Sequence, residues 1–462
     1  MNIAGMASNR GRNLRTIADR APGGAELSVV VANDADAPIL DAAAERGIPT
    51  EVVERDGDSR EAHEERILDA LDGYDFDLVC LDGYMRVLTE AFLDAAPTTL
   101  NIHPSLLPSF PGQNAHEQVL DAGVSVTGCT VHVVTEAVDG GPIVTQESVP
   151  VYADDDETDL KDRVLSEAEF RAYPRAVEWF AEDRVTVDHD DETVSVEGDD
   201  GGDFPTRRTA SEDRAANLRY GENPHQDAAV YEDRTCDEAS VVGADQLNPE
   251  ANALSYNNYN DTDGALDLIK EFERPAAAVI KHANPAGCAT ADTLADAYER
   301  ALATDPKSAF GGIVALNREC DGATAEQIID SFKVVVIAPG YTDDAIDVLQ
   351  QKESMPILEV DEIGPDARTE AIAEKSLVGG RLVQERDTQQ LTRDDLEVVT
   401  EAEPTEEQIE SMLFGWQTVK HVTSNAVIFT KGTETVGVGA GQLSRVDAVK
   451  VAQMKAESDA EG

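Results

Sequence analysis

The chain has 462 residues, a length that predicts two or three domains rather than one compact core. It carries 92 acidic residues against 37 lysines and arginines, and the resulting net charge of -55 argues against DNA or RNA as a partner, because nucleic-acid binding relies on basic patches. Since 41% of the residues are hydrophobic, this charge indicates a folded protein with an acidic surface, as expected for a halophile whose salt-rich cytoplasm screens the self-repulsion.

The first part of the chain alternates apolar runs with helical patterns. A short strand, a loop containing Gly11 and a helix come first. We then expect strands at 26–34, 76–84 and 98–103, helices at 37–47 and 59–74, an antiparallel hairpin from 128–135 and 141–151, and a long amphipathic helix at 158–183. This order predicts an α/β fold with a Rossmann-like, mostly parallel sheet.

The composition changes at 186–213, which is acidic, glycine-containing and turn-prone. A second globular pattern begins near Leu218. We therefore expect a domain at 1–185, an acidic linker at 186–213 and a second α/β domain at 214–462.

Several classes of protein are excluded by what the sequence lacks. No apolar run approaches the length of a membrane span, and the N-terminus has no signal-peptide pattern, so we expect a cytoplasmic protein without a membrane partner. The sequence has no CxxC pair and no HExxH motif, so it predicts neither a disulfide framework nor a metal site. The five cysteines are widely spaced: Cys80, Cys129, Cys236, Cys288 and Cys320.

The stretch NIHPSLLPSFPG at 101–112 is too rich in proline for a regular helix or a central strand. It follows an expected strand, and loops at the carboxyl ends of parallel strands are where such folds bind ligands. The amide of Asn101 and the imidazole of His103, held on a stiff backbone, are suited to stabilising an oxyanion in acyl transfer. From spacing alone, His103 is equally compatible with a structural loop histidine.

An acid is needed to set the charge of His103 or to accept a proton, and the turn DGGP at 139–142 offers Asp139. Asp-Gly is also ordinary turn chemistry, so a purely structural Asp139 stays open. Backbone amides at the helix start after Gly11 could hold a phosphate, although the pattern is neither GxGxxG nor a P-loop. We expect His132, which faces away from its neighbouring valines, and His116 to be structural.

Residues 1 to about 185 resemble phosphoribosylglycinamide formyltransferase, a family that transfers the formyl group of 10-formyltetrahydrofolate to the amine of glycinamide ribonucleotide. The matching stretches, in order, are SNRGRNL, LDGYMRVLT, NIHPSLLPSFPG, HEQVLDAGVSVTGCTVHVVTEAVDGGPIV and RVLSEAEFRAYP. The resemblance implies a catalytic trio of Asn101, His103 and Asp139. It also implies a phosphate loop at Gly11, Arg12 and Asn13, a ribose-binding Glu169, and a folate pocket lined by Arg86, Val87 and Leu88.

The second half contains AVIKHANPAG at 278–287, where a short apolar strand runs into Lys281 and His282 and the chain then turns. An adjacent lysine and histidine disfavour each other's charged form, which can keep the imidazole neutral as a base. A strand end with solvated polar residues is the alternative on this motif alone.

With LRYGENPHQ, LSYNNYNDTDGALDLIKEF, TDPKSAFGGIVALN and VKHVTSNAVIFTKGTETVGVGAGQLSRVDA, this motif resembles the transformylase domain of the bifunctional purine enzyme that formylates aminoimidazole carboxamide ribonucleotide (AICAR). The resemblance covers about 213–460. It implies a cytidine-deaminase-like α/β fold without zinc, and a homodimer with its sites at the interface. The implied residues are catalytic Lys281, His282 and Asn425, substrate-binding Arg219, Tyr220, Asn258 and Arg445, and folate-side Phe310 and Gly311.

The sequence departs from that family in three places. Val334 stands where relatives usually place an acid. The chain ends at Gly462, before a segment near SDAFFPF and a last stretch with a substrate-binding arginine, so a C-terminal part is expected to be missing. The cyclohydrolase domain that normally precedes the transformylase is replaced by the first formyltransferase, so we expect no ring-closing activity.

The leading hypothesis is a purine-biosynthesis enzyme with two formyl transferases that share one folate donor and act on small ribonucleotides. One alternative is another user of the first fold, either a formyl-folate hydrolase or a methionyl-tRNA formyltransferase. The tRNA function needs a basic tail, and this chain has an acidic one. A further alternative is that the second half serves only as a dimerisation scaffold.

Overall fold

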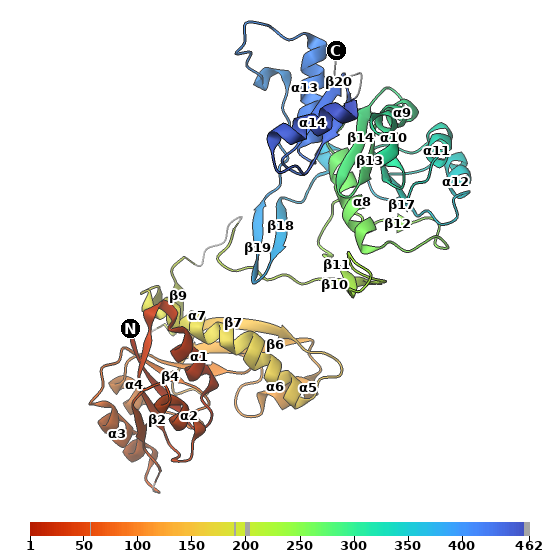
Figure 1. Cartoon of the computed structure of the whole chain (residues 1–462). Coiled ribbons are helices and arrows are strands. Elements are labelled where there is room, and N and C mark those ends of the chain that lie inside the picture. The colour runs from red at the N-terminus through yellow and green to blue at the C-terminus, as the bar shows by residue number, and fades with distance from the viewer. Residues whose placement is uncertain (56, 189–190, 199–203, 457–462) are drawn as a thin grey trace. The chain divides into compact units, whose positions relative to one another are not determined.

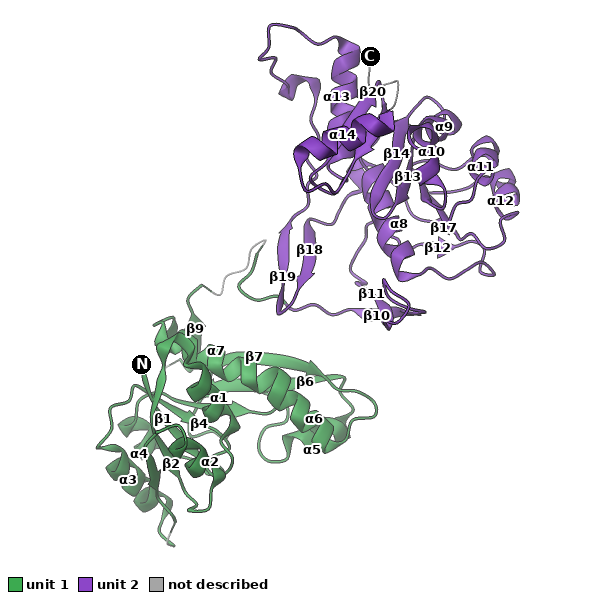
Figure 2. Ribbon diagram, in the orientation of Figure 1, with its two compact units in different colours: residues 1–208 green, residues 209–462 purple. Residues whose placement is uncertain are grey.

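The computed structural model describes residues 1–55, 57–188, 191–198 and 204–456, and its contacts divide the chain into two compact units, 1–208 and 209–462 (Figure 2). The division lies inside the segment expected as a linker. The described part of that segment includes an antiparallel hairpin, β8 (Val185–Asp188) and β9 (Thr193–Val196), which packs beside unit 1 strand β7 (Ile143–Pro150). Each unit is considered by itself below.

Unit 1 is built on a seven-stranded sheet of order β3-β2-β1-β4-β5-β6-β7 (Figure 1). Its first five strands are parallel, and the pairings β5–β6 and β6–β7 are antiparallel. The strands are β1 (Asn2–Ala7), β2 (Glu26–Ala32), β3 (Thr50–Val52), β4 (Leu78–Leu81), β5 (Thr99–His103), β6 (Val126–Val133) and β7. The predicted mostly parallel α/β fold ending in a hairpin is confirmed.

Helices cover both faces of this sheet. They are α1 (Arg12–Arg20), α2 (Pro38–Ala44), α3 (Arg60–Leu71), α4 (Glu90–Ala95), α5 (Ala115–Ala122), α6 (Glu157–Arg163) and α7 (Phe170–Ala181). Alternate strand residues enter two cores: Ile3 packs with α1, whereas Met6 packs on the side of α3 and α4. Because both faces are buried, the strands appear in the sequence as continuous apolar runs.

The long helix expected at 158–183 is interrupted. A π-helical segment, Val164–Glu169, joins α6 to α7. Such segments insert an extra residue into a helix and are frequent at functional sites. Here the segment ends at Glu169, on the wall of the cavity described below.

Unit 2 contains an eight-stranded sheet of order β12-β17-β16-β15-β13-β14-β21-β20, in which β15, β16 and β17 are parallel. Two-stranded ribbons, β10–β11 and β18–β19, complete its strands. The bounds are β10 (Asp213–Leu218), β11 (Ala228–Glu232), β12 (Asp245–Gln246), β13 (Ala276–Lys281), β14 (Asn284–Thr290), β15 (Ile313–Leu316), β16 (Val335–Ala338), β17 (Ile357–Glu359), β18 (Ile372–Leu377), β19 (Gly380–Glu385), β20 (Val427–Lys431) and β21 (Glu434–Gly439).

The helices of unit 2 are α8 (Tyr256–Ile269), α9 (Leu294–Thr304), α10 (Pro306–Ala309), α11 (Gly322–Ile329), α12 (Asp343–Leu349), α13 (Glu406–Val419) and α14 (Arg445–Ala456). The core on one face of the sheet includes α8 residues and Phe414, and the core on the other includes residues of α9, α11 and α12. Val334, at the position where an acid was expected, packs against the α8 core. The predicted α/β class therefore also holds for this unit.

Two further findings apply to the described residues. None of their helices is both long and apolar enough to cross a membrane. Nor do they contain a group of three or more His, Cys, Asp or Glu side chains placed to hold a metal ion.

Candidate active sites

Unit 1 holds a cavity of about 770 Å³ where the carboxyl ends of β1, β4 and β5 meet the β6–β7 turn. Ligands bind at this edge of open α/β sheets. The sequence-predicted residues on its wall are Arg12, Asn13, Arg86, Val87, Leu88, Asn101, His103, Asp139 and Glu169. Gly11 does not line the cavity; it precedes α1 with φ +51°, and a Cβ there would lie 2.5 Å from Ile39.

His103 and Asp139 form the most closely paired part of this cavity. His103 Nδ1 lies 3.2 Å from Asp139 Oδ2, and Nε2 lies 2.8 Å from the carbonyl oxygen of Phe110. Both ring nitrogens of His103 therefore lie beside an oxygen atom of the protein. Burial opposes ionisation of Asp139, but its contacts with His132 and the Gly112 N–H outweigh burial and lower the pKa of the carboxyl.

The turn that carries Asp139 is fixed by its backbone. Asp139 adopts φ +52°, a conformation that aspartate tolerates better than most residues, and the Gly112 N–H donates to its Oδ2 at 2.7 Å. A Cβ on Gly141 would lie 1.9 Å from the Val133 carbonyl oxygen, so the close return of the DGGP turn onto β6 requires glycine there. The turn therefore aims Asp139 at His103.

Asn101 and His132 are cross-strand neighbours on β5 and β6. His132 Nδ1 lies 3.0 Å from the Val133 carbonyl oxygen, and its Nε2 lies 3.2 Å from Asn101 Nδ2. This contact holds the Asn101 amide beside the His132 ring. Nε2 is also 3.7 Å from Asp139 Oδ1. His132, expected to be only structural, thus contacts two members of the predicted trio.

The other part of the wall lies at the start of α1. Asp82 Oδ2 accepts from the backbone N–H groups of Asn13 and Leu14, at 2.7 and 3.2 Å. Two of the amides expected to hold a phosphate are therefore bonded to a protein carboxyl. An anion in the cavity could instead bind the cationic side chains on its wall, which are those of Arg10, Arg12 and Lys161.

Glu169 accepts a hydrogen bond from Asn13 Nδ2 at 2.7 Å, and burial raises the pKa of its carboxyl to about 7. A raised pKa means that protonated Glu169 stabilises the fold below its ordinary value of 4.5, and that this contribution disappears as the pH rises through about 7. We expect Glu169→Gln to stabilise ligand-free unit 1 at pH 8 by at most about 3 kcal/mol and by much less at pH 5. Thermal unfolding at both pH values measures this difference. Exposed Glu167→Gln is the matched control, and an equal Glu169→Gln effect at the two pH values would contradict the assignment.

Unit 2 has a second cavity, of about 430 Å³, lined by Lys281 and His282 together with residues of α10, β14, β21 and α14. Lys281 Nζ donates to the Phe310 carbonyl at 2.8 Å. His282 is exposed and adopts φ +55°, and Asp261 of α8 accepts its backbone N–H at 3.1 Å. The chain thus turns sharply at His282 and presents its imidazole to solvent beside Lys281.

The other predicted residues of unit 2 do not line this cavity. Arg219 lies over the ring of Tyr220 beside the β10–β11 ribbon, and Asn258 uses its amide oxygen to cap α8 at Ser255. Asn425 Nδ2 donates to the Gln442 carbonyl at 3.1 Å. Arg445 begins α14, and Phe310 and Gly311 lie between α10 and β15, where Phe310 pairs with Phe332.

Three residues that contact predicted site residues were not themselves predicted to be functional: Asp82, His132 and Asp261. The sequence held a partial signal for each. Asp82 follows an apolar strand in LDGYMRVLT, the position at which polar groups enter such sites. His132 stands between two valines in an expected strand, and Asp261 follows the asparagine-rich start of α8.

Comparison with known proteins gives two family matches. Residues 173–455 match the AICARFT/IMPCHase bienzyme family, and residues 1–177 match the formyl transferase family. The bifunctional purine biosynthesis protein PurH of Roseobacter denitrificans is 48% identical over 263 residues, which are 56% of this chain and 49% of that protein. PurH of Shouchella clausii is 46% identical over 265 residues, 57% and 50% of the two chains. The chain therefore spans about half the length of the curated relatives that it matches.

Solved structures are also similar to part of this chain. Glycinamide ribonucleotide transformylase 1 from Symbiobacterium toebii is 41% identical with a TM-score of 0.41, covering 42% of this chain and 93% of that one. Phosphoribosylglycinamide formyltransferase from Brucella melitensis is 45% identical with a TM-score of 0.37, covering 39% of this chain and 95% of that one.

Proposed function

We propose, on the premise that this chain belongs to the AICARFT/IMPCHase bienzyme family and carries a formyl transferase domain ahead of it, that it is a purine-biosynthesis enzyme with two formyl-transfer sites. Unit 1 transfers the formyl group of 10-formyltetrahydrofolate to glycinamide ribonucleotide, and unit 2 transfers the same group to AICAR. The observation that carries the proposal is the meeting of Asn101, His103 and Asp139 on the wall of one cavity.

In unit 1 the substrate amine attacks the formyl carbon and the carbonyl oxygen becomes an oxyanion. Asn101 Nδ2 and the His103 imidazolium stabilise that oxyanion. Because Asp139 lines the cavity and Phe110 does not, the Nδ1 edge of His103 faces the reacting groups and shares its proton between Asp139 and the oxyanion. Asp139 then takes the amine proton and relays it, directly or through water, to the folate nitrogen, as the oxyanion collapses to the new formyl carbonyl and the C–N bond to the folate breaks.

In this unit, Arg86, Val87 and Leu88 line the folate side of the cavity. The phosphate and ribose of the nucleotide lie toward Arg12, Asn13 and Glu169, and Gly11 shapes the backbone at that loop. Glu169 binds ribose hydroxyls best as a carboxylate, so nucleotide binding is expected to strengthen as the pH rises through about 7.

In unit 2, His282 acts as the base on the weakly nucleophilic AICAR amine, and Lys281 donates a proton to the leaving folate nitrogen. Asn425 is the third catalytic group, and Arg219, Tyr220, Asn258 and Arg445 contact the nucleotide. Phe310 and Gly311 contact the folate. The support is the shared cavity of Lys281 and His282, which the family match covers.

The test is formyl transfer by the whole chain in concentrated KCl, with each nucleotide offered separately and the formylated product identified by mass. Transfer to both nucleotides is the expected result. Transfer to neither overturns the proposal, and formate release without an acceptor indicates a hydrolase. If glycinamide ribonucleotide is the only nucleotide formylated, unit 2 is a dimerisation scaffold without a transfer activity of its own.

A homodimer through unit 2 is part of the proposal, because two helices that pack on β20 carry large apolar side chains in solvent. On α13 these are Met412 and Trp416; on or just before α14 they are Leu443, Val446, Val449 and Met454. We expect sedimentation to give twice the chain mass, and the double variant Val446→Glu, Val449→Glu to give the monomer. A wild-type monomer at micromolar concentration would contradict this.

A further inference from the structure

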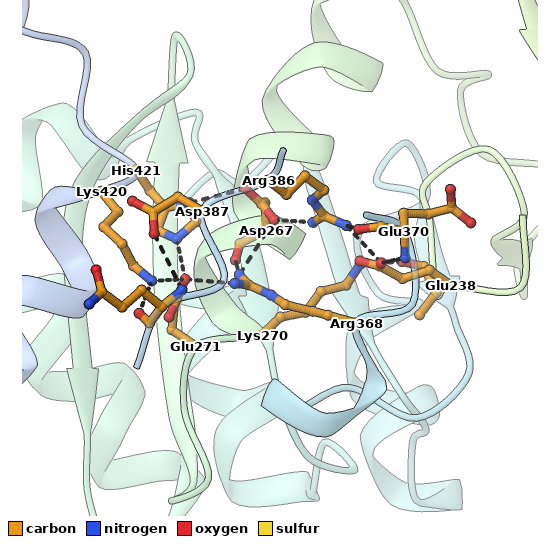
Figure 3. Close-up of polar contacts among 12 residues, drawn as sticks. Glu238, Asp267, Lys270, Glu271, Arg368, Glu370, Arg386, Asp387, Lys420 and His421 are labelled. Atoms are coloured by element: carbon orange, nitrogen blue, oxygen red, sulfur yellow. Dashed lines mark hydrogen bonds and ion pairs between the residues drawn. The ribbon is translucent and has the colours of Figure 1, made fainter. Parts of the chain in front are cut away.

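His421 follows α13 and lies between two carboxylates of unit 2 (Figure 3). Its Nε2 is 2.9 Å from Glu271 Oε1, and its Nδ1 is 3.3 Å from Asp267 Oδ2. The two acids are four residues apart, at and just beyond the C-terminal end of α8. A neutral imidazole would turn a lone pair toward one carboxylate, so this geometry requires the imidazolium.

The surroundings of His421 contain further charges. Arg368 and Lys420 also bind Glu271, and Arg386 binds Asp267 and Glu238, which in turn pairs with Lys270. These groups come from the C-terminal end of α8, the residues that flank the β18–β19 ribbon, the end of α13 and, for Glu238, the segment before β12. Burial opposes a charge on His421, but its hydrogen bonds to Asp267 and Glu271 outweigh burial and raise the pKa of the imidazole.

The chain that follows His421 leads directly to the candidate site. The Thr423 N–H donates to Asn284 Oδ1 at 2.9 Å, and Asn284 Nδ2 donates to the carbonyl of His282 at 2.9 Å. Two residues further along the chain is Asn425. The segment 421–425 therefore connects the ion cluster to the turn of the proposed base.

Helix α8, whose C-terminal end lies beside His421, also holds the His282 turn near its N-terminal end. Asp261 of α8 accepts the backbone N–H groups of His282 and Ala283, at 3.1 and 2.8 Å. One rigid helix thus fixes the His282 turn through Asp261 and the 421–425 segment through Asp267 and Glu271. The distance between the two loops of the site depends on both attachments.

We propose that His421 is a positioning residue, whose imidazolium fastens the 421–425 segment to α8 and so sets Asn425 and the His282 turn for AICAR formylation. This rests on the proposed function of unit 2. The attachment is complete while His421 is protonated. It is lost as the pH rises through the raised pKa of the imidazole, because the neutral ring no longer bridges Asp267 and Glu271.

The experiment is hydrogen–deuterium exchange on the whole chain at several pH values, with rates corrected for intrinsic exchange. We expect amides of 421–426 and 282–286 to lose protection in wild type as the pH rises. In His421→Phe they should be unprotected at every pH, with His421→Lys restoring protection. Arg381→Gln, which removes the Arg381–Glu374 ion pair on the β18–β19 ribbon, is the matched control. Equal protection of these segments in His421→Phe and wild type overturns the proposal.

An activity measurement separates this proposal from the proposed function. We expect His421→Phe to lower kcat for AICAR transfer by ~10- to 100-fold with little change in KM, because misplaced catalytic groups mainly cost turnover. Unit 1 transfer should be unchanged. If wild type transfers no formyl group to AICAR, the function of unit 2 fails while the exchange result still decides the attachment. If AICAR transfer in His421→Phe equals that of wild type, the positioning role is wrong.

Discussion

Replacing His103 by alanine is expected to lower kcat for formyl transfer to glycinamide ribonucleotide by ~10²- to 10⁴-fold, the usual contribution of a positioned acid–base or oxyanion group. The change removes the cation that faces the developing oxyanion. It also leaves Asp139 without its partner at 3.2 Å. Steady-state kinetics with saturating folate donor measure the loss, and we expect a much smaller change in KM.

The control for this prediction has to address folding, because the His103 side chain is only 5% exposed. His103→Asn keeps a hydrogen-bonding side chain without the charge, and it should lose nearly as much activity as alanine. His63→Phe removes another buried histidine of unit 1 that lies outside the cavity and should retain activity. AICAR transfer in the same sample reports on unit 2. A His103→Ala enzyme within tenfold of wild type would refute the role of His103.

The second large effect is expected at His282. His282→Asn should lower AICAR transfer by ~10²- to 10⁴-fold by removing the proposed base. Asparagine is chosen because His282 has φ +55°, a conformation that asparagine adopts more readily than alanine. Single-turnover formylation, followed by the mass of the product nucleotide, measures the chemical step without product release.

His282 is exposed, so its replacement should not disturb the core of unit 2. An unchanged melting temperature and unchanged transfer to glycinamide ribonucleotide are therefore the expected controls. If His282→Asn transfers formyl groups to AICAR at the wild-type rate, the base is another group. Lys281→Met then tests whether the neighbouring ammonium alone carries the reaction.

Much of unit 1 was predictable from its sequence because its signals are local. Apolar runs gave the parallel strands, and the proline-rich stretch marked the strand end at His103. The contribution of His132 could not be inferred from strand alternation. Alternation correctly placed it opposite Val131 and Val133, but only the β5–β6 register shows that this face meets Asn101 and the cavity.

Unit 2 was less predictable because its decisive contacts are distant in sequence. His421 lies 150 residues from Glu271, and Arg386 lies 148 residues from Glu238. No periodicity joins such pairs. The 186–213 segment has the composition of a linker, yet Val185–Asp188 and Thr193–Val196 pair as strands, because alternating Thr and Val residues favour a hairpin even in acidic sequence.

Because the two compact units belong to one polypeptide, the cell makes them in equal numbers. Under the proposed function, each molecule made by the cell brings one site for glycinamide ribonucleotide and one for AICAR, so the ratio of the two sites cannot change with gene expression. Both sites draw on a single folate pool, so a shortage of donor slows the two steps together. A cell that needed to adjust one step alone would have to act on the catalytic rate of one unit, since protein abundance changes both equally.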